Sequence, residues 1–86
     1  MSNGHDARFQ VLAEADPQVL LRVLGLFAQR SIVPSDVAMT TKGGRMHIDL
    51  RQAGLSEAAA AIISAKLHSI PLVSTVELQL IENCPC

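Results

Sequence analysis

Residues 41–52 read TKGGRMHIDLRQ, and this stretch decides the fold. Its Gly43-Gly44 pair is a turn signal for a β-hairpin. The residues that follow alternate between apolar and polar side chains, as in a strand with one buried face. The apolar set is Met46, Ile48 and Leu50, and the polar set is Arg45, His47, Asp49 and Arg51. The strand before the turn should begin after Pro34, which cannot donate to a sheet, or lie at a sheet edge, with Val37, Met39 and Thr41 on one side.

A helix is predicted before this hairpin, over residues 17–30. Asp16 is a good N-cap, and Pro17 suits the first helical position. The polar positions fall on one stripe and comprise Gln18, Arg22, Gly25 and Gln29. The opposite side, expected to face the core, comprises Leu20, Val23, Leu24 and Phe27. Because Leu21, Leu26 and Ala28 widen the apolar surface beyond what one sheet face needs, the pattern indicates an additional partner surface.

A second helix is predicted after the hairpin, between Ser56 and Pro71. Ser56 is its N-cap, and acidic Glu57 lies in the first turn, where the helix dipole favours a negative charge. The expected buried stripe comprises Ala59, Ile63, Leu67 and Ile70. Alternating runs at 8–14 and 73–82 complete the pattern as two more strands. Their inward sets are Phe9, Val11 and Ala13 in the first run, and Val76, Leu78 and Leu80 in the last.

The element order is therefore β-α-β-β-α-β within 86 residues. This order predicts an α+β domain whose four-stranded antiparallel sheet carries both helices on one face and leaves the other face open. We assign residues 7–82 to one domain, residues 1–6 to a flexible lead-in and residues 83–86 to a flexible tail.

Composition argues against several classes of function. The net charge of −1 offers no basic patch for nucleic acid, and Phe9 and Phe27 are the only aromatic residues. RNA-binding sheets of this topology stack bases on aromatic side chains at the outward positions of the central strands. None of those positions is aromatic here; they are Arg8, Gln10, Leu12, His47, Asp49 and Arg51. No apolar run is long enough for a membrane span, and the start lacks a signal-peptide core, so we expect a cytoplasmic protein.

Chemistry-bearing residues are few. His47 and Asp49 share a strand face and could form an acid–base pair, but a solvated face or a protein interface explains them better. The Cys84-Pro85-Cys86 tail lacks nearby partners for a metal site. We therefore expect no metal in this chain, and from the lack of a convincing reactive group we expect no catalytic residue and no cofactor. The turn before the first helix is the remaining candidate, since helix N–H groups can receive a carboxylate; an ordinary capped turn is the alternative.

Residues 16–30 read DPQVLLRVLGLFAQR, and this run resembles the start of ACT domains. It is most similar to the regulatory (small) subunit of acetolactate synthase, which carries Leu-x-Arg-Val-x-Gly-Leu-Phe-x-x-Arg at this place. The matching residues are Leu20, Arg22, Val23, Gly25, Leu26, Phe27 and Arg30. The resemblance implies a ferredoxin-like ACT domain over residues 7–82. In length the chain is similar to the short, single-domain small subunit of the valine-insensitive bacterial isozyme.

The resemblance also implies a ligand site, which here departs from the family pattern. By position it comprises Ala15, Asp16, Pro17, Gln18, Val19 and Val33. Valine-responsive members read Asn-x-x-Gly in the turn, where this chain has Ala15 and Gln18, and Gln18 would crowd the space that glycine leaves. They read Gly-Tyr-Asn after the helix, where this chain has Ser31-Ile32-Val33. We therefore expect no response to valine.

The implied function is that of a non-catalytic regulatory subunit, which binds and activates the catalytic large subunit of acetolactate synthase. In that family the large subunit carries thiamine diphosphate, FAD and Mg²⁺. We expect contact through the helix flank or through Arg8, His47, Asp49 and Arg51, and a homodimer formed by the second strand and first helix. The alternative is a stand-alone homodimeric ACT domain that senses a small amino acid.

Overall fold

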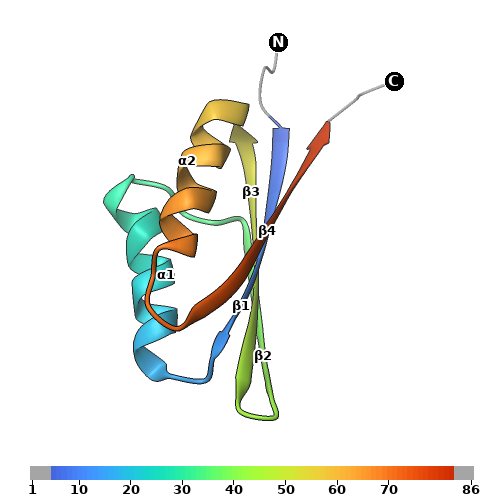
Figure 1. Ribbon diagram of the computed structural model, residues 1–86. Helices are drawn as coiled ribbons and strands as arrows, with labels where there is room; N and C mark the ends of the chain where they lie inside the picture. The colour runs from blue at the N-terminus through green and yellow to red at the C-terminus, as the bar shows by residue number, and fades with distance from the viewer. Residues whose placement is uncertain (1–4, 83–86) are drawn as a thin grey trace.

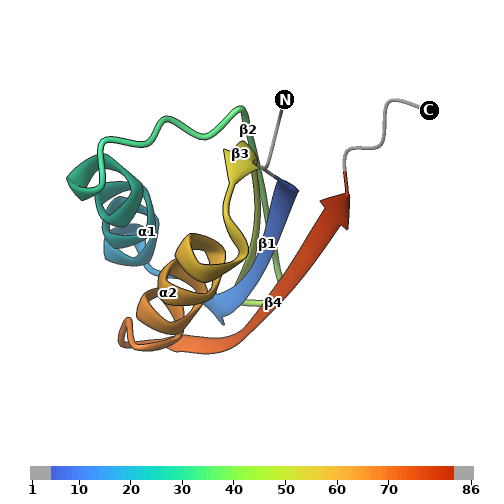
Figure 2. The same ribbon diagram turned by 90° about the horizontal axis from the view of Figure 1, so that it is seen from above.

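The chain forms two layers, a four-stranded sheet and a pair of helices on one of its faces (Figures 1 and 2). The computed structural model describes residues 5–82. Its elements are β1 (His5–Glu14), α1 (Pro17–Gln29), β2 (Asp36–Lys42), β3 (Arg45–Leu55), α2 (Glu57–His68) and β4 (Val73–Glu82). The strand order is β2-β3-β1-β4, with every neighbouring pair antiparallel. The predicted fold is confirmed.

The hairpin between β2 and β3 forms as the sequence predicts. Lys42 lies opposite Arg45, and the two residues between them have φ values of 59° at Gly43 and 77° at Gly44. Both values lie in the left-handed region, which a two-residue hairpin turn of this kind requires and which glycine adopts without steric cost.

Two strands are longer than predicted. β1 begins at His5, so residues 5 and 6 are not part of a flexible lead-in but pair with β4, where Asp6 lies opposite Ile81. β3 continues past residue 52, where the alternating stretch that predicted it ends, through Gly54 to Leu55. A shift in the β1–β3 register absorbs the irregularity, and Gly54 has a φ of 75°. Such an inserted residue bends a strand without ending it. The flexible segments predicted for 1–4 and 83–86 lie outside the described residues.

Both helices begin at the predicted N-caps. The Oδ1 of Asp16 accepts a hydrogen bond from the N–H of Gln18 at 2.9 Å, and Pro17 is the first helical residue. The Oγ of Ser56 accepts one from the N–H of Ala59 at 3.1 Å. These bonds satisfy N–H groups that have no partner within their helices.

α1 ends in a Schellman motif. The N–H of Ile32 donates to the carbonyl of Phe27 at 2.9 Å, and the N–H of Ser31 donates to the carbonyl of Ala28 at 2.9 Å. Ser31 has a φ of 58°, a conformation that costs energy in a residue with a Cβ atom.

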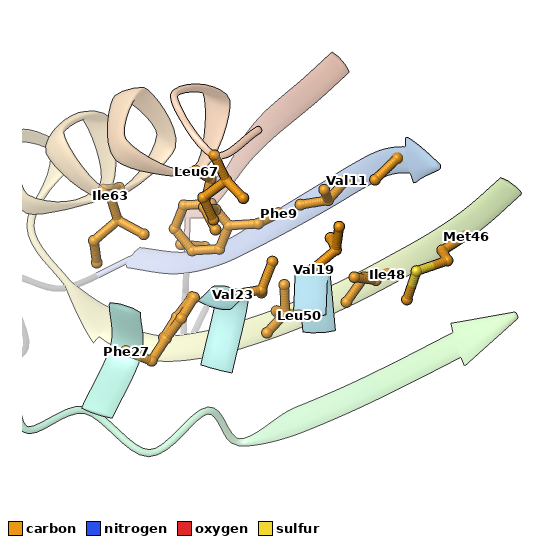
Figure 3. Packing of buried hydrophobic residues seen from close by; sticks show 14 of the residues in the cluster. Phe9, Val11, Val19, Val23, Phe27, Met46, Ile48, Leu50, Ile63 and Leu67 are labelled. Carbon is orange, nitrogen blue, oxygen red and sulfur yellow. The ribbon is translucent and has the colours of Figure 1, made fainter. Parts of the chain in front are cut away.

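The core lies between the helices and the inner face of the sheet (Figure 3). The rings of Phe9 on β1 and Phe27 on α1 pack edge to face, with centroids 5.6 Å apart. Met46, Ile48 and Leu50 are buried as predicted. α1 buries Val19, Val23 and Phe27, so the expectation of a buried Leu24 is wrong, because the helix turns the Val19 side to the sheet. α2 buries Ala60 in place of the predicted Ala59.

Candidate functional site

The turn between β1 and α1 is held by two other turns. The N–H of Ala15 donates to the carbonyl of Gly44 at 3.0 Å, in the β2–β3 hairpin. The N–H of Glu14 donates to the carbonyl of Leu72 at 3.0 Å, in the turn that precedes β4. The packing leaves a surface hollow of about 430 Å³ beside the start of α1. It is lined by Asp16, Pro17, Gln18, Val19, Arg22, Pro71 and Leu72.

The backbone donors of this turn are already bonded within the chain. Pro17 has no N–H, the N–H of Gln18 donates to the Asp16 side chain, and the N–H of Val19 donates to the Asp16 carbonyl at 3.0 Å. A carboxylate ligand at a helix N-terminus would need such N–H groups. The turn is thus an ordinary capped helix start, and a ligand there would have to displace the Asp16 carboxylate.

Val33 lies far from this turn within one chain. It follows the C-terminal end of α1, and a helix of 13 residues is about 20 Å long. Its side chain is 84% exposed. The structure brings Ala15, Asp16, Pro17, Gln18 and Val19 together, but it does not bring Val33 to them. The six residues could form one site only if two chains contributed to it.

The open face of the sheet gathers the other predicted residues. Arg8 on β1 forms an ion pair with Asp49 on β3, with Nη2 to Oδ2 at 2.6 Å and Nε to Oδ2 at 3.1 Å. Arg8 lies directly opposite Arg51 in the register, so the ion pair runs diagonally between the two strands. His47 lies two positions before Asp49 on β3, opposite Leu12, and is exposed. The structure therefore places all four side chains on one surface.

The electrostatics of this face follow from the ion pair. The hydrogen bond from Arg8 is the main cause that lowers the pKa of Asp49, and the charge of Arg51 lowers it further. The same hydrogen bond raises the pKa of Arg8. Asp49 therefore stays ionised at neutral pH. Arg51 lies opposite Asp36 on β2, yet among the described residues the only salt bridge is that of Arg8 and Asp49.

Two shallow hollows flank the ion pair. One, of about 370 Å³, is lined by Gln10, Val11, Leu12, Ala38, Thr40, His47, Ile48, Asp49, Thr75 and Glu77. The other, of about 280 Å³, is lined by Asp6, Ala7, Arg8, Ser35, Asp36, Arg51, Gln52, Ala53 and Ile81. Their polar rims suit the docking of a partner surface with charges of both signs. Within residues 5–82 there is no cluster of three or more His, Cys, Asp or Glu side chains that could hold a metal ion.

Sequence reasoning missed two features of this surface. It placed Arg8 and Asp49 on one face but did not pair them, because the pairing depends on the β1–β3 register. The exposure of β2 was not predicted either: Val37, Met39 and Thr41 share one side of the strand as expected, yet all seven residues of this edge strand are exposed. Val37 and Met39 are 41% and 46% exposed. Pro34 had indicated that this strand begins after it or lies at a sheet edge, and the structure shows both, since β2 begins at Asp36 and is an edge strand.

No helix in the described part of the chain is long and apolar enough to cross a membrane.

The fold is similar to that of several solved structures. The ACT domain of GTP pyrophosphokinase from Chlorobium tepidum superimposes with a TM-score of 0.77 at 16% identity, over 90% of this chain and 88% of that one. An uncharacterized protein from Thermotoga maritima gives 0.76 at 15% identity, over 92% and 99%. A homoserine dehydrogenase from Thiobacillus denitrificans gives 0.71 at 22% identity, over 93% of this chain but only 18% of the enzyme. At these identities the likeness shows the fold alone.

No curated protein matches the sequence. The family model of the ACT-like domain matches residues 2–84, which is nearly the whole chain. Together with the β-α-β-β-α-β topology, this match shows that the chain belongs to the ACT-like domain family.

Proposed function

We propose that this ACT-like domain is a non-catalytic regulatory subunit that binds and activates the catalytic subunit of acetolactate synthase. The observation that carries the regulatory role is the open sheet face, where the Arg8–Asp49 ion pair is flanked by Arg51 and His47. The resemblance of residues 16–30 to the small subunits of that enzyme supports the choice of partner. In this proposal the cofactors belong to the partner, and the complex forms in the cytoplasm.

The open face is the proposed contact with the catalytic subunit. Arg8 and Asp49 hold each other in place, so that they present fixed charges to a partner at little cost in side-chain entropy. Arg51 and His47 are exposed on the same strand as Asp49. Activation would then be a coupling free energy, since a subunit that binds the active conformation more tightly raises its population.

A homodimer through β2 and α1 is a second part of the proposal. β2 is an edge strand with unpaired backbone groups on its outer side, and such edges need to be covered or blunted. β2 itself carries the exposed apolar residues Val37 and Met39, and α1 carries Leu24, which is 36% exposed. Symmetric pairing of two β2 strands would join the sheets and bury these apolar side chains. It would also place the turn of one chain beside the second strand of its partner.

The alternative function is that of a stand-alone homodimeric sensor of a small amino acid. The hollow of about 430 Å³ at the β1–α1 turn favours it, because Arg22 on its wall could pair with a ligand carboxylate. The internal hydrogen bonds of Gln18 and Val19 argue against it. The regulatory subunit is therefore the better supported of the two.

Co-expression with the acetolactate synthase large subunit of the same organism tests the proposal. We expect the two chains to co-purify, and we expect added chain to raise acetolactate formation while showing no turnover alone. If the large subunit neither binds nor responds, the proposal fails. Calorimetric titration with single amino acids would then test the sensor function, which predicts saturable binding of one of them.

A further inference from the structure

A second candidate surface lies on the helical layer, on the opposite side of the molecule from the open sheet face. α1 and α2 lie side by side there (Figure 2), and a shallow groove of about 470 Å³ is formed between their outer surfaces. Leu21, Gly25 and Leu26 contribute from α1, and Lys66 contributes from α2. The Leu21 side chain is 70% exposed, the second highest value among the large apolar residues that are exposed. The groove is therefore partly apolar and open to solvent.

Gly25 is the residue in this groove that the chain itself does not explain. It lies in the middle of α1, although glycine is among the poorest helix formers. Its φ is not in the left-handed region, and a Cβ atom built on it would meet no other atom within 4 Å. Neither the backbone conformation nor the packing of the chain requires a glycine there. A glycine that leaves space on a helix surface permits the close approach of another molecule.

The charges around the groove restrict what that molecule can be. Arg22 and Lys66 line it, both are exposed, and no carboxylate is among its lining residues. A second copy of this chain docked here about a twofold axis would bring the same cations together, which is unfavourable. A partner that carries carboxylates would instead form complementary pairs with them.

We propose that the groove between α1 and α2 docks an amphipathic, acidic helix of a partner protein. Its apolar side would pack on Leu21 and approach the backbone at Gly25, and its carboxylates would lie beside Arg22 and Lys66. This mode of recognition places apolar anchors in a groove and uses flanking charges for orientation. The proposal holds for any partner with such a helix and does not depend on acetolactate synthase.

The test uses a synthetic helical peptide of about five turns. One of its faces carries leucine, and glutamate flanks that face; in a matched peptide lysine replaces every glutamate. Each is titrated into isotopically labelled protein and followed by NMR. We expect the glutamate peptide to shift the amide signals of Leu21, Gly25 and Lys66 and to bind about tenfold or more tightly than the lysine peptide. No binding, equal binding of both peptides, or shifts confined to the open sheet face would overturn the proposal.

Two substitutions at Gly25 and one control sharpen the test. Gly25→Leu should fold, because a Cβ atom at this position meets no other atom within 4 Å, yet it should weaken peptide binding about tenfold or more. Ala65→Leu enlarges an exposed position of α2 outside the groove and should leave binding unchanged. Gly25→Ala should raise the thermal midpoint of the isolated chain, since alanine is the better helix former. A lower midpoint would show that the fold itself needs the glycine, and unchanged peptide binding by Gly25→Leu would equally refute the groove.

Discussion

The two faces of the sheet differ in what their side chains do. The covered face presents apolar side chains to the helices, and they are buried in one internal core except on the edge strand β2, where Val37 and Met39 are exposed. The open face presents polar side chains, and only one pair of them, Arg8 and Asp49, forms a salt bridge within the described residues. The covered face therefore determines stability, whereas the open face can change without unfolding the domain. The β1–α1 turn is also satisfied within the chain, because its backbone N–H groups donate to other groups of the same molecule.

The largest loss of stability is expected from a truncation in the core between the covered face and the helices. Phe27→Ala removes a fully buried ring that packs edge to face on Phe9. Such truncations typically cost about 3–5 kcal/mol of unfolding free energy. Urea denaturation measures this loss, and Leu21→Ala serves as the control because its side chain is exposed and should cost less than about 0.5 kcal/mol. Equal losses for both variants would show that the core is not where the structure puts it.

A second prediction concerns the internally bonded turn. Calorimetry should detect no binding of valine, because the N–H groups of Gln18 and Val19 are occupied. Val33, which a second chain would have to bring to the turn, offers no side-chain hydrogen bond either. The triple variant Ala15→Asn, Gln18→Gly and Val33→Asn should gain affinity, by about 1–3 kcal/mol if two hydrogen bonds are restored. Micromolar affinity of the unmodified chain for valine would contradict the description of this turn as closed.

Features that depend on neighbouring residues were predicted correctly from the sequence, whereas features that depend on contacts between distant segments were not. Local signals were reliable: Asp16 and Ser56 cap their helices, and Gly43-Gly44 forms the hairpin. The orientation of α1 was not predicted correctly at Leu24, because its apolar surface is wider than the face that the sheet covers. Several rotations of the helix therefore fitted the sequence, and packing in the core, where Phe27 meets Phe9 of β1, selected one of them.

The candidate site was predicted less completely than the fold. Alternation along β1 and β3 placed Arg8, His47, Asp49 and Arg51 on one face, which the structure bears out. The ion pair could not be predicted, since a strand's partner and register are set by contacts far apart in the sequence. The hydrogen bonds that close the β1–α1 turn involve the hairpin and the turn before β4, which no local pattern reveals.

The end of α1 offers a smaller effect that leaves both faces intact. Ser31 adopts a left-handed conformation in the Schellman motif, where glycine is usual. Ser31→Gly should therefore raise the unfolding free energy by up to about 1 kcal/mol, since the strain of a Cβ atom in this region is relieved. Gly43→Ala is the matched opposite, because it adds a Cβ atom at a φ of 59° and should destabilise the hairpin. Thermal denaturation of both variants checks the sign of each effect.

The ion pair on the open face should make a small, pH-dependent contribution to stability. The hydrogen bond from Arg8 lowers the pKa of Asp49 in the folded state, so the unfolded chain binds a proton there at a higher pH. The contribution is present above the unfolded pKa of about 3.9 and is lost as the pH falls through the lower folded value. Unfolding free energies of the wild type and Asp49→Asn, measured from pH 7 downward, should therefore converge in acid. A constant difference at all pH values would argue against the pair.

The most direct test of the account compares how variants of the two regions activate the proposed catalytic subunit. Arg51→Glu reverses a charge on the open face, where an exposed substitution should change stability by less than about 0.5 kcal/mol. Gln18→Ala changes the closed turn. The measurement is the concentration of chain that half-activates the acetolactate synthase large subunit. We predict an increase of about tenfold for Arg51→Glu, equivalent to about 1.4 kcal/mol of binding free energy, and no change for Gln18→Ala. The reverse result, an unaffected Arg51→Glu and an impaired Gln18→Ala, would contradict the assignment of partner recognition to the open sheet face.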